Sequence, residues 1–158
     1  MALKPTRTTA YGQDDVRHFM AVTAEAGIVV TYGALAPSGN LDDPLATVII
    51  PTGQIGTPVG ILTCNVVNKD LTQTHLNAHK DEVQVNGKVS IMKKGQIQTD
   101  QTASTPSPGD PAYFTTNGQL TTSAGSGGTG ATHRIGTFVS SVDSDGYVVV
   151  DIDPQRLS

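Results

Sequence analysis

Alternating hydrophobic and polar residues recur in short runs along the C-terminal half of the chain, and a two-residue turn sequence interrupts three of these runs. The three turn sequences are Asn86-Gly87, Asn117-Gly118 and Asp145-Gly146. Asn-Gly and Asp-Gly accept the positive φ angles of a type I′ turn, whose twist matches a pair of antiparallel strands. The pattern therefore predicts three β-hairpins. They span residues 82–92, 112–122 and 136–152.

The remaining apolar runs predict further strands of the same sheet. Residues 28–32 and 47–50 are short runs rich in β-branched residues, and the longer run 59–67 predicts a strand that is buried on both faces. Residues 95–99 continue the sheet after a solvated turn at Lys93-Lys94. Pro154 is expected to close the last strand.

The N-terminal residues differ in character from the rest of the chain. Residues 1–13 are polar and without periodicity, which is typical of a segment that does not fold alone. Residues 14–20 could form one or two helical turns with Asp14 as the N-cap. We therefore expect an extended N-terminal arm over residues 1–20. A single β-rich domain follows over residues 21–158, with a flexible Gly/Ser loop at 123–132.

These patterns together predict a mainly β fold class. The expected domain is a small β-sandwich or barrel-like unit built from hairpins, with at most one or two short helices. Composition agrees, because the 17 glycines and 9 prolines suit a chain with many turns. Hydrophobic residues make up 37% of the chain and aromatic residues only 4%, so the core is expected to be aliphatic.

Charge and cysteine content exclude several function classes. The net charge is −4 and the basic residues are scattered, so the chain lacks the basic patch with which proteins contact nucleic-acid phosphates. The single cysteine, Cys64, lies in an apolar run and is expected to be a buried, inert thiol. Neither a signal peptide nor an apolar stretch of membrane-spanning length is found, so we expect no membrane partner and synthesis in the cytoplasm.

Two histidines are the strongest candidates for chemistry. His75 and His79 are four residues apart and would share one face of a helix, as in many metal sites. The zincin pattern needs Glu directly after the first His, however, and Leu76 stands there. A polar crossover segment is therefore the simpler interpretation, and the sequence predicts neither a metal nor another cofactor.

Two other motifs are also better explained as turns or loops. Residues 123–132 are glycine-rich, but no Lys follows and the chain leads into a strand, so the Walker pattern is not met. Asp143 and Asp145 resemble the start of a calcium loop without its later bidentate Glu. No catalytic residue is predicted from these patterns.

The order of several sequence blocks resembles a known family, the head-decoration or capsid cement proteins of tailed bacteriophages. In the later half the blocks lie on both sides of the Gly-rich gap, and in the earlier half they run from the buried strand to the first predicted hairpin. The later blocks are 109–114, 117–121, 135–138 and 145–150, and the earlier blocks are 59–62, 66–72, 75–77 and 79–89. The resemblance covers roughly residues 22–153.

The resemblance implies a non-enzymatic virion protein. It implies a β-rich domain on the outer capsid surface, commonly a homotrimer, that binds the major capsid protein and stabilises the head without a cofactor. The arm suits a tether that becomes ordered on binding. Its basic and aromatic side chains are the expected capsid contacts. These residues are Lys4, Arg7, Tyr11 and Arg17.

Two alternative functions stay open at this point. The first is a β-module of the phage tail or baseplate. The scarcity of aromatic residues argues against a carbohydrate-binding tip, because sugars usually stack on aromatic rings. The second is a trimeric β enzyme that uses His75 or His79.

Overall fold

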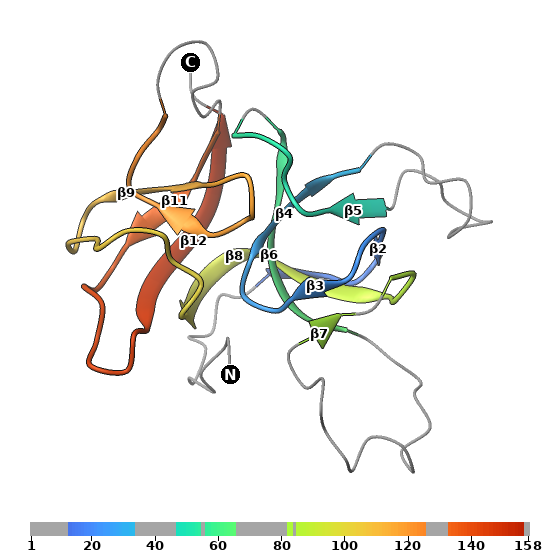
Figure 1. Ribbon diagram of the computed structural model, residues 1–158, viewed down its shortest axis with the longest axis horizontal. Coiled ribbons are helices and arrows are strands. Elements are labelled where there is room, and N and C mark those ends of the chain that lie inside the picture. Colours follow the sequence, from blue (N-terminus) through green and yellow to red (C-terminus); the bar gives the residue numbers. More distant parts are fainter. Residues whose placement is uncertain are drawn as a thin grey trace.

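The structure, a computed structural model, describes residues 13–33, 47–54, 56–65, 82–83, 85–125 and 133–156. Within these ranges the chain forms twelve β-strands and no helix, which confirms the predicted mainly β class (Figure 1). The strands are β1 (Gln13–Asp15), β2 (Phe19–Met20), β3 (Ala24–Glu25), β4 (Val29–Tyr32), β5 (Thr47–Ile49), β6 (Pro58–Asn65), β7 (Glu82–Val83), β8 (Val89–Thr99), β9 (Pro111–Phe114), β10 (Leu120–Thr121), β11 (His133–Phe138) and β12 (Val148–Arg156).

Most of the strands belong to one sheet. Its order is β10-β9-β11-β12-β8-β6-β4-β5-β2, and β1 joins as a branch on β8. The strands β3 and β7 form a separate antiparallel pair. Among the described pairs only β2 and β5 run parallel. The first and last strands of the sheet do not pair with each other, so the sheet does not close into a barrel.

Strand β8 is the longest strand in the described part of the chain, and it connects the two halves of the sheet. Its first residues pair with β6 on one edge and with β1 on the other, and residues 95–99 pair with β12. Gly95, where the partner changes, has φ 129, a backbone angle that favours glycine. The solvated turn predicted at Lys93-Lys94 is therefore wrong. Both lysines lie inside β8, because neighbouring strands hold its backbone on both sides of Gly95.

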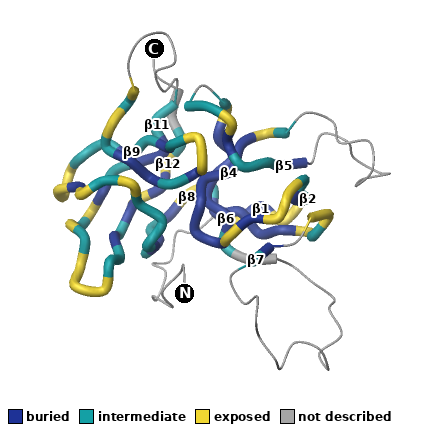
Figure 2. Tube along the Cα trace, in the orientation of Figure 1, coloured by how far each residue is buried: buried dark blue, intermediate teal, exposed yellow. Residues whose placement is uncertain are grey.

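Figure 2 shows that the central strands β6 and β8 are largely buried. Neighbouring side chains of these strands belong to two separate hydrophobic cores. On β6, Ile61 enters the first core and Leu62 the second. On β8, Met92 enters the first and Ile91 the second. The first core consists of Val29, Ile61, Met92, Ile97, Ala112, Phe114, Leu120, Ile135, Phe138, Val148, Val150 and Ile152. The second consists of Met20, Ala24, Ile28, Val30, Val48, Val59, Leu62, Val83, Val89 and Ile91.

This arrangement agrees with the expected aliphatic core and with the three strands predicted in the N-terminal half. Residues 28–32 and 47–50 contain β4 and β5. The first part of the apolar run 59–67 lies in β6, where residues 59–62 are buried, as expected for a strand that is covered on both faces. Cys64 also lies in β6, but its side chain is outside the described residues.

Two of the three predicted hairpins are confirmed. Strands β9 and β10 pair with Leu120 opposite Phe114, and β11 and β12 pair with Phe138 opposite Val150. Their turns are not type I′, since only the glycines, Gly118 at φ 77 and Gly146 at φ 87, have positive φ. In each turn the glycine N–H donates to the carbonyl three residues earlier, so a type I turn precedes a left-handed glycine.

The hairpin predicted around Asn86-Gly87 is wrong. Asn86 does adopt the expected positive φ of 60, but its N–H donates to the carbonyl of Met20 over 2.7 Å. Gly87 accepts a hydrogen bond from the Met20 N–H over 3.0 Å. The flanking strands also find other partners, because β7 pairs with β3 and β8 pairs with β6. The N-terminal segment thus hydrogen-bonds to the backbone groups that would otherwise have paired within a hairpin.

Strand β12 continues past Pro154, contrary to the prediction that this proline closes it. The register of β12 against β11 shifts between the pairs Arg134–Gln155 and Gly136–Ile152. This shift leaves Asp153 and Pro154 opposite the single residue Ile135. Proline has no N–H to donate to a ladder, and a bulge is one of the few places where a strand accepts it.

The last part of the predicted N-terminal arm forms strands. Residues 13–15 form β1 and pair with β8, and Phe19 and Met20 form β2. The helical turns predicted for residues 14–20 are therefore wrong, because these residues satisfy their backbone groups across strands. Residues 1–12 and residues 126–132 of the Gly/Ser loop lie outside the described residues. The division into an arm and a domain stays a prediction there.

Candidate functional site

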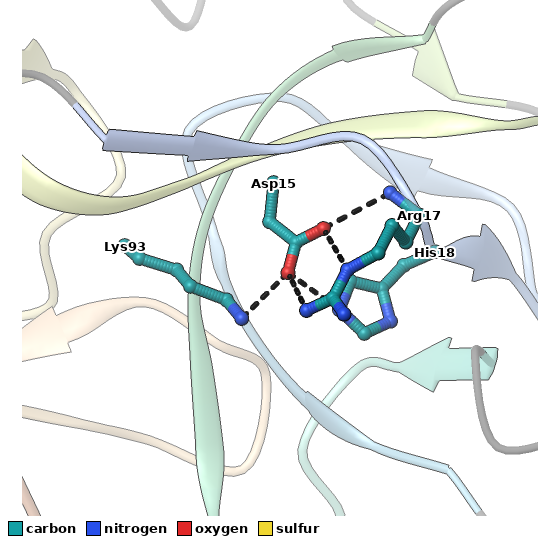
Figure 3. A network of polar contacts seen from close by, with 4 residues as sticks. All are labelled: Asp15, Arg17, His18 and Lys93. Carbon is teal, nitrogen blue, oxygen red and sulfur yellow. Dashed lines mark hydrogen bonds and ion pairs between the residues drawn. The ribbon is translucent and has the colours of Figure 1, made fainter.

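A buried carboxylate at the end of β1 is the centre of a network of hydrogen bonds and ion pairs (Figure 3). Asp15 is 8% exposed, and its Oδ1 accepts hydrogen bonds from the backbone N–H and the Nε of Arg17, both at 3.0 Å. Its Oδ2 lies 2.8 Å from Nη2 of Arg17 and 2.6 Å from Nζ of Lys93. The network therefore joins the N-terminal segment to the central strand β8.

The charges around Asp15 keep it ionised. The Arg17 guanidinium holds the pKa of the Asp15 carboxyl far below its ordinary value of 3.8, and Lys93 acts in the same direction, while burial opposes both. Charge-assisted hydrogen bonds of this kind are stronger than those between neutral groups. Asp15 is thus unsuited to give or take a proton near neutral pH, and the network has the character of a structural lock.

His18 lies on the inner side of the same network. Its Nε2 is 3.4 Å from Oδ2 of Asp15, and its ring meets Tyr32 edge to face with centroids 5.8 Å apart. Its carbonyl accepts a hydrogen bond from the N–H of Val89 over 3.0 Å. The imidazole is buried, so His18 packs between the N-terminal segment and β4 and offers no open face to a substrate.

Residues 13–21, which we call the N-terminal strap, cross several strands of the second core. Besides the pairing of β1 with β8, Ala21 donates its N–H to the carbonyl of Val48 over 2.9 Å. Met20 is fully buried in the second core. The strap is therefore part of the folded body. The strap therefore fixes the position of Gln13, where the described part of the chain begins.

The outer side of the network is an open hollow of 340 Å³. Its lining combines exposed apolar surface from Val16, which is 45% exposed, with the Arg17 side chain, which is 76% exposed. Arg17 is held by Asp15 although it faces solvent. Arginine is enriched at the energetic centres of protein interfaces, and a group held in place loses less entropy on binding. This hollow is the candidate contact surface.

The structure places one of the four predicted contact residues, Arg17, in this network. The other three, Lys4, Arg7 and Tyr11, lie outside the described residues, as do His75 and His79. Sequence reasoning missed Asp15 and Lys93. The adjacent charges Asp14-Asp15 were interpreted as a helix start, and Lys93-Lys94 as a solvated turn. The only usable signal in the sequence was the alternation of side chains along a strand, which places one of the two lysines, Lys93 or Lys94, on the inner face.

The aspartates near the C-terminus serve turn geometry, as predicted for Asp145-Gly146. Oδ1 of Asp143 accepts hydrogen bonds from the N–H of Asp145 at 2.9 Å and from the N–H of Tyr147 at 2.8 Å. Within the described residues, no group of three or more His, Cys, Asp and Glu side chains is placed to hold a metal ion. The described ranges also contain no helix that is long and apolar enough to span a membrane.

These features define a class of protein, a β-sheet module whose main polar network locks its own N-terminal segment in place. A sequence model of the phage cement family, described as structural cement protein (E217 gp24/Pam3 gp6), matches residues 5–153. The chain belongs to this family of structural cement proteins, as its sequence blocks had indicated. No curated protein matches the chain.

Proposed function

We propose that this chain is a cement protein that binds the outer surface of the major capsid protein lattice and stabilises the phage head. The observation that carries the proposal is the match of the structural cement family over residues 5–153, nearly the whole chain. The family is a structural one, which supports action without catalysis or a cofactor. A protein of this kind works by holding capsid proteins together from many positions at once.

We also propose that the protein binds as a homotrimer. A threefold assembly would present three identical patches to symmetric neighbours on the capsid. Linked contacts gain affinity without any single contact being tight, provided that the geometry lets them engage together. The stabilisation of the head would then come from the number of engaged copies.

The arm supplies the proposed capsid contacts. Lys4, Arg7 and Tyr11 precede the strap, and Arg17 lies exposed on it. Because residues 13–15 and 19–20 pair with the sheet, we propose residues 1–12 as the part of the arm that acts as a tether. A segment that becomes ordered on binding can cover a large surface, although its ordering costs free energy.

Cryo-electron microscopy of purified virions, with peptide mapping of the shell, tests the proposal directly. We expect density for this chain on the outer capsid lattice, with three copies around a local threefold axis. Density in the tail or baseplate would instead support the alternative of a tail module. Absence from the virion would overturn the proposed function.

Capsids that lack the protein allow a second test by adding it back. A chain that begins at Gln13 keeps the strap and is expected to fold but to bind capsids weakly. The triple variant Lys4→Ala/Arg7→Ala/Tyr11→Ala should bind weakly for the same reason. The control variant Lys88→Ala/Lys94→Ala removes the same positive charge from exposed positions of the body and should bind as the wild type does. Equal binding by all four proteins would exclude the tether.

A further inference from the structure

Strand β1 is too short to determine its own register. It contains three residues, and its pairing with β8 is irregular between Gln13 and Asp14. A slip of one residue turns every side chain of a strand to the opposite face, and short strands resist such slips poorly. Backbone hydrogen bonds of Met20 and Ala21 hold the strap further along the chain, but the short ladder of β1 itself selects the observed register only weakly.

The Asp15 network is well placed to make that selection. Asp15 stands opposite Ile91 on β8, and Lys93 lies two residues further along β8. A diagonal neighbour of this kind lies within reach of a long side chain, as the 2.6 Å contact between Asp15 and Lys93 demonstrates. A one-residue slip of β1 would turn the carboxylate to the other face and leave Lys93 without it.

Stability alone is a poor explanation for this network. Removing a charge from water is costly, and well-packed apolar residues often stabilise a protein as much as a buried ion pair does. The best-attested benefit of buried polar groups is that they fix register. That benefit matters here because Gln13, opposite Lys94, is the residue to which residues 1–12 are covalently joined.

We propose that Asp15 and Lys93 form a register lock that permits one alignment of β1 on β8 and so fixes the position of Gln13, to which residues 1–12 are joined. Asp15 is a positioning residue in this scheme, because it acts through the strand that carries the arm. The consequence for capsid binding rests on the proposed function. The lock itself does not, and it can be measured on the free protein.

The test replaces the ion pair by apolar residues of similar size, in the full chain. In Asp15→Leu/Lys93→Met we expect the midpoint of chemical unfolding to stay close to that of the wild type. We expect the amides of residues 13–15 to exchange at least tenfold faster, and the nuclear Overhauser contacts of Gln13 with Lys94 and of Asp14 with Met92 to weaken or move to neighbouring residues.

A matched control uses the neighbouring lysine of the same strand. Lys94 and Asp153 are both more than half exposed and lie 3.7 Å apart, so Asp153→Leu/Lys94→Met makes the same change in an exposed pair. Its contact between Asp14 and Met92 and the exchange of its residues 13–15 should match those of the wild type. Asp15→Asn is a second test variant for the case in which the apolar pair does not fold. It keeps the shape of the side chain, and we expect it to loosen β1 as well.

The outcomes separate the lock from the proposed function. Native β1 contacts and native exchange in both Asp15 variants would overturn the lock, as would equal loosening in the Asp153 control. On capsids that lack the protein, the Asp15 variants should bind at least tenfold more weakly than the wild type and the control. If the wild type itself does not bind capsids, the proposed function fails while the exchange data still decide on the lock.

Discussion

Lys93 Nζ lies 2.6 Å from Oδ2 of Asp15, so a lysine of the longest described strand meets a carboxylate that is almost fully buried. The two residues lie far apart in the sequence, on the first strand β1 and on β8. Because β8 also pairs with β6 and β12, this contact ties the N-terminal strap to both halves of the sheet.

The substitution Asp15→Asn should destabilise the protein. It removes the negative charge and leaves Lys93, only 27% exposed, without its counter-ion. Breaking a fully buried ion pair costs about 3–5 kcal/mol, and the exposure of Arg17 lowers the expected loss here to about 2 kcal/mol. Chemical denaturation at pH 7 measures this free energy of unfolding.

The control for this prediction is Asp153→Asn. Asp153 pairs with Lys94 over 3.7 Å, and because both side chains are more than half exposed this ion pair contributes about 0–1 kcal/mol. An equal loss in both variants would mean that the burial of Asp15 is irrelevant to its contribution.

The stability of the protein should also depend on Asp15 in acid. The pKa of Asp15 in the folded protein lies far below its ordinary value of 3.8, so the folded state binds fewer protons than the unfolded state. Its contribution is therefore fully present above the ordinary pKa and is lost as the pH falls toward the lower folded pKa. Below about pH 4 the wild type should lose stability more steeply than Asp15→Asn, by up to about 1.4 kcal/mol per pH unit.

Denaturation curves at several values between pH 2.5 and pH 8 would test this dependence. From pH 5 to pH 8 the difference between the two proteins should stay constant, because Asp15 is ionised in both the folded and the unfolded wild type. Parallel curves over the whole range would show that the carboxylate has the same pKa in both states.

Local turn chemistry correctly predicted two of the three hairpins, although not their turn type. Asn117-Gly118 and Asp145-Gly146 each join strands that are neighbours in the chain, and both hairpins formed. Asn86-Gly87 has the same chemistry, yet Met20 pairs with its backbone instead. A turn sequence indicates which backbone conformation is locally favourable. It does not indicate whether a distant segment will hydrogen-bond to the same backbone groups.

The candidate site was harder to predict for the same reason. Arg17 was chosen as a contact because it is basic and lies in the arm, without any indication that Asp15 orders it. The Asp15–Lys93 contact depends on β1 pairing with β8, which no local pattern specifies. Pro154 likewise looked like a strand end, since a bulge depends on the register with β11.

Gly136→Ala should weaken the pairing of β11 with β12. A Cβ at this position would lie 1.9 Å from the carbonyl oxygen of Asp151, a backbone atom that cannot move aside cheaply. We expect a loss of about 2–3 kcal/mol from this overpacking, measured by thermal or chemical unfolding.

Gly146→Ala is the matched comparison for the clash at Gly136. A Cβ there meets no atom within 4 Å, but the residue has φ +87 in a turn. The expected cost is then purely conformational, about 1–2 kcal/mol. A smaller loss for Gly136→Ala than for Gly146→Ala would mean that β11 and β12 can move apart at that point.

The two cores should unfold together. Neighbouring residues of β6 and β8 point into different cores, so neither core can be opened without disturbing the strands that line the other. Phe138→Ala in the first core and Met20→Ala in the second should each cost about 2–5 kcal/mol. Each should also speed hydrogen exchange in both halves of the sheet to a similar extent.

The informative signal in this experiment is exchange in the half that was not altered. In Phe138→Ala the amides of β4 and β5 should lose protection together with those of β11 and β12, and a single unfolding transition should remain. Val139→Ala, at the exposed neighbour of Phe138, should leave exchange unchanged in both halves. Faster exchange in β11 and β12 with unchanged protection in β4 and β5 would mean that the two cores unfold independently and that β8 does not couple them.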